Sequence, residues 1–252
     1  MYLTLPFLAS ALLSSAVSAR HISSEGCASS TTTGPAPSAS SASSILSTGT
    51  RGIPANVEAF REAARGDCSN KLGEAGDFVY CGDNSENPTI IFLKGPGDQF
   101  DNMDIDCDGL NPGSGDCSND QTGQSETAFK DQVKEASNNL VTDLDASKVP
   151  YVVFGNDGSD PPFDPAKLNM EPLSVMAVLC GDKLVYGIWG DVNADTSTGE
   201  ASISLAKLCF PDEDITGDSG HDANDVLYIG FTGKDAVAAE SYDWSVLPLP
   251  SG

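Results

Sequence analysis

Positive charge is scarce in this sequence. Its 252 residues include 13 Lys and Arg against 37 Asp and Glu, which gives a formal net charge of −24. Nucleic acids and anionic membranes are bound by clustered Lys and Arg side chains, and the chain has no basic stripe of this kind. We therefore expect neither nucleic acid nor a membrane as a partner. The charge favours a metal ion or a polycation and opposes a polyanion.

Histidine and closely spaced cysteine pairs are also scarce. Only His21 and His221 are present, and no Cys-x-x-Cys pair occurs. A structural zinc site is built from such ligands. A Ser-His-Asp triad needs a His base, and no serine stands in a Gly-x-Ser-x-Gly motif. We predict no metal site and no cofactor, so carboxylates are the abundant reactive groups that remain.

Long apolar runs are missing beyond the N-terminus. Residues 1–19 carry no charged side chain and end in the small residues Val17-Ser18-Ala19, which predicts a secretory signal peptide. Residues 20–50 are rich in Ser, Thr, Ala and Pro, and this composition predicts a flexible leader. No later segment reaches the ~18 apolar residues that a membrane span requires. We expect residues 51–252 to form the folded domain of a secreted, extracellular monomer.

Seven cysteines in a secreted chain indicate disulfide bonds. Cys27 lies in the leader and is the odd one out. The other six, which could form three bridges, are Cys68, Cys81, Cys107, Cys117, Cys180 and Cys209. Spacing does not determine their connectivity. We expect Cys107 to pair with Cys117 across a Gly-rich loop, and Cys180 to pair with Cys209 between neighbouring elements.

The pattern of the domain is mainly that of short strands. Amphipathic helices are predicted at residues 56–65, with Asn56 as cap and Gly66 as stop, and at residues 126–138. Short runs rich in Val, Ile and aromatics, separated by Gly, Asp, Asn and Pro, predict strands at 78–81, 89–93, 151–154, 174–180, 183–189, 201–205 and 226–231. Gly181-Asp182 between two of these runs predicts a hairpin. We expect a mainly antiparallel β-barrel or sandwich with few helices.

An acidic stretch runs from Asp104 to Gly109. Its oxygens at alternate positions and its glycine copy the start of a calcium loop. The twelfth position is Gly115, where an EF-hand carries a bidentate Glu, and this argues against an EF-hand. The stretch is either a solvated acidic loop or a cluster that binds cationic groups.

A pair of carboxylates follows from the pattern of residues 183–191. If these residues form a strand, alternation places Trp189 and Asp191 on one face. Residues 192–199 would then connect to a strand that opens at Glu200. The two carboxylates would stand at the ends of adjacent strands, beside the Trp189 ring.

Two carboxylates that flank a cleft, with a ring to stack on a sugar, are the minimum needed to hydrolyse a glycosidic bond. One carboxylic acid protonates the leaving oxygen, and the other carboxylate activates water or attacks the sugar. The alternative is that Asp191 is a turn residue and Glu200 an exposed strand end. On composition alone that alternative is favoured, because acidic loops are frequent in this chain.

Several long blocks of the sequence resemble one family. These blocks are MDIDCDG at 103–109, PYVVFGN at 150–156, PLSVMAVLCGDKLVYGIWGD at 172–191, GEASISLA at 199–206 and DANDVLYIGF at 222–231. In this order they resemble the fungal chitosanases of glycoside hydrolase family 75. The resemblance implies endo-hydrolysis of the β-1,4 linkages of chitosan with inversion, by an Asp and a Glu that match Asp191 and Glu200. We expect Glu200 to be the general acid and Asp191 the base.

The resemblance also implies a compact β-barrel, for which the double-psi type is one candidate. Chitosan carries protonated amines in mild acid, so it suits a strongly acidic protein. The predicted substrate-binding residues are Trp189, Tyr186, Asp104, Asp106, Asp108 and Asp157. Two other functions stay open: a non-catalytic polysaccharide-binding protein on the same scaffold, and an acidic secreted calcium-binding or interaction protein. Neither requires the catalytic pair.

Overall fold

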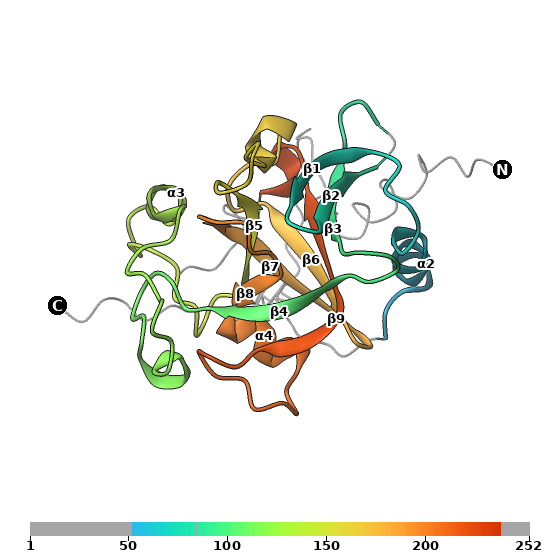
Figure 1. The fold of residues 1–252 in the computed structure, drawn as a ribbon. Coiled ribbons are helices and arrows are strands. Elements are labelled where there is room, and N and C mark those ends of the chain that lie inside the picture. Colours follow the sequence, from blue (N-terminus) through green and yellow to red (C-terminus); the bar gives the residue numbers. More distant parts are fainter. Residues whose placement is uncertain (1–51, 84, 238–252) are drawn as a thin grey trace, which may run out of the picture.

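A computed structural model describes residues 52–83 and 85–237 (Figure 1). The predicted signal peptide, the leader and Cys27 lie outside the described residues. The strands are β1 (Lys71–Ala75), β2 (Phe78–Gly82), β3 (Ile90–Lys94), β4 (Asp101–Asp106), β5 (Tyr151–Asn156), β6 (Val175–Cys180), β7 (Lys183–Asn193), β8 (Glu200–Ser202) and β9 (His221–Phe231). The α-helices are α2 (Ala55–Ala64), α3 (Lys130–Ala136) and α4 (Ile203–Cys209), and short 3-10 helices cover Gly115–Cys117, Pro165–Leu168 and Lys234–Ala236.

The described strands form one sheet in the order β1-β2-β3-β9-β4-β8-β5-β7-β6. Because β6 also pairs with β9, the strands β9, β4, β8, β5, β7 and β6 close into a ring. The predicted mainly-β architecture is confirmed. Most pairs are antiparallel as predicted, but β4 with β8 and β5 with β7 are parallel. The double-psi subtype stays a prediction.

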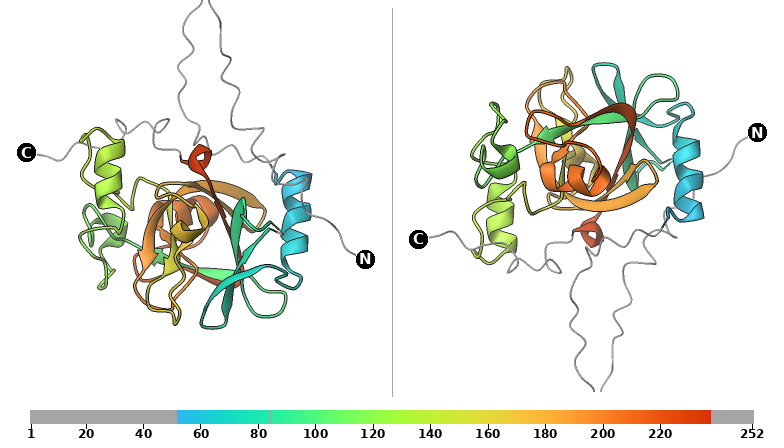
Figure 2. Two further views of the ribbon diagram at one scale, coloured as in Figure 1. Left: turned by 90° about the horizontal axis from the view of Figure 1, so that it is seen from above. Right: turned by 90° about the horizontal axis from the view of Figure 1, so that it is seen from below.

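The core has two parts because several strands are buried on both faces. Along β6, Met176 and Val178 belong to the main apolar cluster of the ring, whereas Ala177 and Leu179 belong to a second cluster. This alternation follows the two-residue period of a strand. Helix α2 contributes Phe60 to the second cluster. Figure 2 shows α2 and α3 on opposite sides of the strands.

No helix in the described ranges is long and apolar enough to cross a membrane.

Three disulfides join the six cysteines of the described residues. Cys107–Cys117 and Cys180–Cys209 are the two predicted bridges, and both are confirmed. The third bridge is Cys68–Cys81. The predicted hairpin at Gly181-Asp182 is also confirmed, since Cys180 pairs with Lys183 and Gly181 takes the positive φ of +58° that this turn requires.

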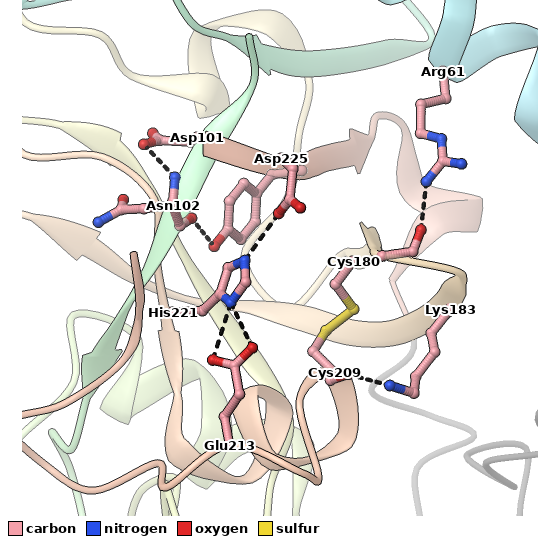
Figure 3. Close-up of polar contacts among 11 residues, drawn as sticks. Arg61, Asp101, Asn102, Cys180, Lys183, Cys209, Glu213, His221 and Asp225 are labelled. Carbon is pink, nitrogen blue, oxygen red and sulfur yellow. Dashed lines mark hydrogen bonds and ion pairs between the residues drawn. A yellow bond between two sulfur atoms is a disulfide. The ribbon is translucent and has the colours of Figure 1, made fainter. Parts of the chain in front are cut away.

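The hairpin between β6 and β7 is held from two sides. Arg61 of α2 donates a hydrogen bond of 2.6 Å to the carbonyl of Gly181, and Lys183 donates to the carbonyl of Cys209 (Figure 3). Cys209 is the last residue of α4 and is bonded to Cys180 at the end of β6. The start of β7 is thus fixed to two helices, and this supports the position of the long strand that follows.

The strand predicted at 201–205 is wrong beyond Ser202. The chain turns there into α4, because the Ser202 side chain accepts the backbone N–H of Leu205 and caps the helix. The buried residues that follow Ile203 recur at Ala206 and Cys209, which is a helical spacing. Strands β1 and β4 were not predicted, since their sequences are too polar for a strand pattern.

The helix predicted at 126–138 covers only Lys130–Ala136. The preceding residues do not join it because buried carboxyl groups hold them. Asp143 accepts both the backbone N–H and the hydroxyl of Thr127, and Asp191 accepts the N–H of Ala128. The helix predicted at 56–65 is confirmed, but it begins and ends one residue earlier, at Ala55 and Ala64. Pro54 takes the N-cap position that was predicted for Asn56.

Gly190 marks an irregularity in β7. Trp189 pairs with Val152 while Asp191 pairs with Val153, so Gly190 is an extra residue opposite β5. A Cβ atom there would lie 2.6 Å from the Cβ atom of Tyr151. Only glycine allows the two strands to approach in this way.

We therefore expect Gly190→Ala to lower the free energy of unfolding by about 1–3 kcal/mol, as overpacking of a buried site does. Urea denaturation measures this change. Gly52→Ala is the matched control, because nothing lies within 4 Å of its added Cβ atom. Equal unfolding midpoints for the two variants would contradict the proposed packing at Gly190.

Candidate active site

The strand register brings the two predicted catalytic carboxylates into one row. Val153 of β5 pairs with Asp191 of β7 on one side and with Glu200 of β8 on the other, and Glu200 pairs with Asp104 of β4. Strand β5 therefore lies between β7 and β8, which corrects the prediction that the two carboxylates stand on adjacent strands. At the usual strand spacing their Cα atoms are about 9–10 Å apart.

The two predicted aromatic contacts do not lie in this row. Trp189 is only 1% exposed, and its Nε1 atom donates to the carbonyls of Phe154 at 2.7 Å and of Asp191 at 2.9 Å. The predicted stacking of this ring on a sugar is thereby corrected: the ring supports the end of β7 from inside. The extra residue at Gly190 is the reason, because strict alternation no longer places positions 189 and 191 on one face.

Tyr186 is exposed but distant from Asp191 along the same strand. Tyr186 stands five positions before Asp191 in β7, which is about 17 Å of extended chain. Its side chain is 42% exposed. A contact between Tyr186 and substrate stays a prediction, and any such contact would be remote from Asp191.

Asp191 is a buried carboxyl group at the point where β7 meets the segment before α3. Its Oδ1 atom accepts the N–H groups of Ala128 and Val192, each at 2.8 Å. Its Oδ2 atom is buried and has no hydrogen-bond partner. The pKa of Asp191 is raised to about 7, mainly by burial. The two N–H groups lower this pKa, and the charges of Asp108 and Asp143 raise it.

Glu200 is the first residue of β8 and is held by the loop before it. Its Oε2 atom accepts the side-chain amide of Asn193 at 2.7 Å. Burial raises its pKa to about 8, and the neighbouring charges of Asp104, Asp108 and Asp191 add to the rise. At mildly acidic pH both carboxyl groups therefore keep their protons in the free protein, and the two N–H groups on Asp191 favour its ionisation over that of Glu200.

The predicted acidic stretch takes part in the same site. The carboxylate oxygens of Asp106, Asp108 and Asp191 lie within 4.8 Å of one another. Asp106 is buried, and desolvation together with the charges of Asp191 and Glu200 raises its pKa well above the ordinary value. Tyr151 donates its hydroxyl to the carbonyl of Asp108 at 3.1 Å.

A calcium loop does not form at this stretch. Asp104 and Asp106 belong to strand β4 and pair with β8. A hard divalent cation takes six or more oxygen ligands. Asp106 and Asp191 each already direct one oxygen to backbone N–H groups. The expectation that this cluster holds no metal stays a prediction.

Two further groups adjoin the site, one predicted and one missed. Asp157 is exposed, and its N–H donates to the carbonyl of Asn193 at 2.9 Å, which places it beside the loop that leads to Glu200. Asp101 was missed. It is 2% exposed, and burial raises its pKa to about 6. Its position directly after the buried Phe100 is the one sequence signal that could have shown it.

These raised pKa values make folding stability depend on pH. Asp101, Asp191 and Glu200 keep their protons in the folded protein up to about pH 6, 7 and 8, whereas the unfolded chain loses them near pH 4. Their contribution to stability is complete below about pH 4 and is lost as the pH rises through 6 to 8. We therefore expect urea midpoints to fall from about pH 5 to about pH 9.

A double variant tests the origin of this slope. Asp191→Asn with Glu200→Gln removes two of the titrating groups and should flatten the profile, while Asp157→Asn, which removes an exposed carboxyl, should leave the slope unchanged. The same slope in the double variant as in the parent protein would show that other groups cause it.

Comparison with known proteins identifies the family. The model of the fungal chitosanases of glycosyl hydrolase group 75 matches residues 103–247. An endo-chitosanase of Aspergillus oryzae is 54% identical over 207 residues, covering 76% of this chain and 82% of that protein. An endo-chitosanase B of Aspergillus oryzae is 52% identical over 202 residues, and an endo-chitosanase of Aspergillus fumigatus is 50% identical over 201, each with the same coverage. Because of these matches, this chain belongs to the fungal chitosanase family of glycosyl hydrolase group 75.

Proposed function

We propose that the protein is a secreted endo-chitosanase that hydrolyses internal β-1,4 glucosamine linkages with inversion, and that Asp191 and Glu200 carry the reaction. One observation supports the residue assignment above all. The buried carboxyl group of Asp191 and the half-buried one of Glu200, both with raised pKa values, stand two strands apart in a single row, within a cluster of further carboxyl groups. The names of the relatives support the substrate.

The spacing of the row favours inversion. Inverting glycosidases keep their two carboxyl groups roughly 6.5–9.5 Å apart so that a water molecule fits between the base and the sugar, whereas retaining enzymes keep them about 5–5.5 Å apart. Residues that flank an intervening strand are too far apart for the shorter distance unless both side chains lean inward. The presence of β5 between the pair therefore supports a bound water and a single displacement.

The local hydrogen bonds support the division of roles. Two N–H groups stabilise the ionised form of Asp191, and its unpartnered Oδ2 atom is available to take a proton from water. Glu200 has a higher pKa and accepts only one side-chain amide bond among the contacts of the described residues. Glu200 is thus the general acid that protonates the leaving oxygen, and Asp191 is the general base.

A cationic polymer supplies the charge that the site lacks. No ion pair in the described part of the chain involves Asp191, Glu200 or the three acids of β4 and its following loop, Asp104, Asp106 and Asp108. A protonated amine nearby lowers the pKa of a carboxyl group. Binding of chitosan would therefore ionise Asp191 in the complex. We assign amine pairing to Asp104, Asp108 and Asp157, which are exposed or half-exposed, whereas Asp106 is too buried to be an open contact.

The three disulfides fit an oxidising compartment, which agrees with secretion. The monomeric state stays a prediction. A non-catalytic polysaccharide-binding protein would have no use for two carboxyl groups with raised pKa values, so we rank that function second.

Replacement of either carboxyl group tests the catalytic pair. We expect Asp191→Asn and Glu200→Gln each to lower chitosan hydrolysis by at least ~100-fold, because general acid–base catalysis contributes about that much or more. Release of reducing ends from soluble chitosan measures the loss. The amides keep the acceptor oxygens for Ala128 and Asn193, so both variants should fold and bind chitosan.

The control and the role test use the same proteins. Asp182→Asn changes an exposed acid in the β6–β7 turn and should leave the rate unchanged. Added azide should restore turnover only in Asp191→Asn, with a glycosyl azide of defined anomeric form, since azide replaces the activated water. Parent-like turnover in either amide variant would refute the pair, and rescue of Glu200→Gln alone would reverse the roles.

Salt should weaken the association with polymeric chitosan. Exposed charges are screened within about 8 Å at physiological ionic strength, so attraction between a protein of charge −24 and a polycation falls steeply. The affinity of the Glu200→Gln variant for chitosan, measured at increasing sodium chloride, reports this effect. Turnover of a saturating short oligomer should change much less. Binding of the polymer that is insensitive to salt would show that rings and hydrogen bonds dominate.

A further inference from the structure

A shallow pocket opens beside Glu200, on the side away from Asp191. Its volume is about 320 Å³. It is lined by the β1–β2 turn, the start of β4, the loop before Glu200, and one residue of β9: Ala75, Gly76, Asp77, Phe78, Asp101, Asn102, Asp104, Thr196, Ser197, Thr198 and Asn224. Asp104 connects it with the catalytic row, because Asp104 pairs with Glu200. The pocket therefore continues the row beyond the proposed general acid.

The lining carries three carboxyl groups and no basic residue. These are Asp77, Asp101 and Asp104. Asp101 differs from the other two because only 2% of it is exposed and its Oδ2 atom has no hydrogen-bond partner. An unpartnered buried carboxyl oxygen is costly, and a donor that enters the pocket would remove the cost.

The backbone around Asp101 directs its carboxyl group into this wall. The pairing of β4 with β9 shifts register between Asp101 and Met103, and such an irregularity re-aims a side chain. Its Oδ1 atom accepts the N–H of Asn102 at 2.9 Å (Figure 3). One carboxylate oxygen is thus occupied from the protein side, which leaves Oδ2 for a ligand.

The surroundings of Asp101 are fixed, as a recognition group requires. Tyr228 donates its hydroxyl to the carbonyl of Asn102 at 2.9 Å and holds this part of β4 against β9 (Figure 3). Gly199 packs so closely that an added Cβ atom would lie 2.6 Å from the Asp101 Cγ atom. Because Gly199 directly precedes Glu200, a ligand bound at Asp101 lies next to the proposed acid.

We propose that this pocket is a sugar subsite on the leaving-group side of the scissile bond, and that Asp101 selects a protonated primary amine there over an N-acetyl group. The inference rests on the proposed function. A single ammonium group offers three N–H donors, which match Oδ2 of Asp101 and the adjacent carboxylate of Asp104. An acetamide at the same position carries no charge and leaves the Asp101 carboxyl without its partner.

The size of the pocket favours this occupant over a bare ion. A space of this volume accommodates a sugar-sized group, and its hydroxyl side chains at Thr196, Ser197 and Thr198 suit sugar hydroxyls. The hydrogen bond between the ammonium group and the buried Asp101 carboxyl group would also be strong, since a charge-assisted hydrogen bond contributes more free energy in a buried setting than in water.

The experiment compares charge-matched variants in two assays. Binding is measured calorimetrically with a glucosamine hexamer and with its fully N-acetylated counterpart, in the Glu200→Gln background so that no hydrolysis occurs. We expect Asp101→Asn to weaken the glucosamine hexamer at least tenfold and to change binding of the acetylated hexamer by less than twofold. Asp182→Asn, which removes an exposed acid from a distant turn, should change neither.

A merely structural role for Asp101 would give a different result. The amide keeps an acceptor for the N–H of Asn102. Displacement of the loop before Glu200 would instead lower kcat equally for all substrates. We expect the otherwise unmodified Asp101→Asn enzyme instead to show a raised KM for fully deacetylated chitosan, an almost unchanged kcat, and a smaller preference over partially acetylated chitosan.

The outcomes separate the two proposals. If the parent enzyme cleaves chitosan and Asp101→Asn behaves like Asp182→Asn in both assays, the subsite is refuted and the chitosanase function stands. An equal loss on both hexamers, or a fall in kcat alone, also overturns the subsite. If the parent enzyme neither cleaves nor binds chitosan, the proposed function itself fails.

Discussion

A gathering of buried and half-buried carboxyl groups, which form no ion pair with a cation among the described residues, is the constraint on which this structure depends. Asp101, Asp106, Asp191 and Glu200 all have pKa values raised first by desolvation, and several raise one another's further. Charges of one sign at this distance cannot all ionise in a medium that screens poorly. The site therefore retains protons near neutral pH, and backbone N–H groups, not Lys or Arg, decide which carboxyl group releases its proton first.

The scaffold must hold these groups together against their repulsion. It does so with a closed ring of strands, in which the row of acids is fixed by backbone pairing on both sides. Positive charge is used at the periphery, where Lys207 pairs with Asp116. His221 lies there between Glu213 and Asp225, with both ring nitrogens facing carboxylate oxygens (Figure 3). Covalent bridges at three places add stability that an acidic chain of this size needs.

The sequence predicted those parts of the molecule that depend on local pattern. The strands around the Gly181-Asp182 turn and two disulfides were accessible in this way. The choice of Asp191 and Glu200 as the catalytic pair rested on the family resemblance and stays a prediction. What failed depends on long-range register. No local pattern shows that β5 lies between β7 and β8, or that an extra residue at Gly190 separates the faces of Trp189 and Asp191. Likewise the capping role of Ser202 ends a strand that alternation alone would continue.

The same physics links substrate choice to the state of the catalytic groups. In the free protein, burial keeps Asp191 partly protonated near neutral pH, a form that cannot accept a proton from water. On the proposed function, each amine bound at Asp104 or Asp108 would add a positive charge next to the pair and move the pKa values of Asp191 and Glu200 downward. Asp191, already stabilised by two N–H groups, ionises before Glu200 as this happens. A neutral polysaccharide of the same shape would supply no such charge, so on the proposed mechanism it would leave the base protonated even where it fitted the site.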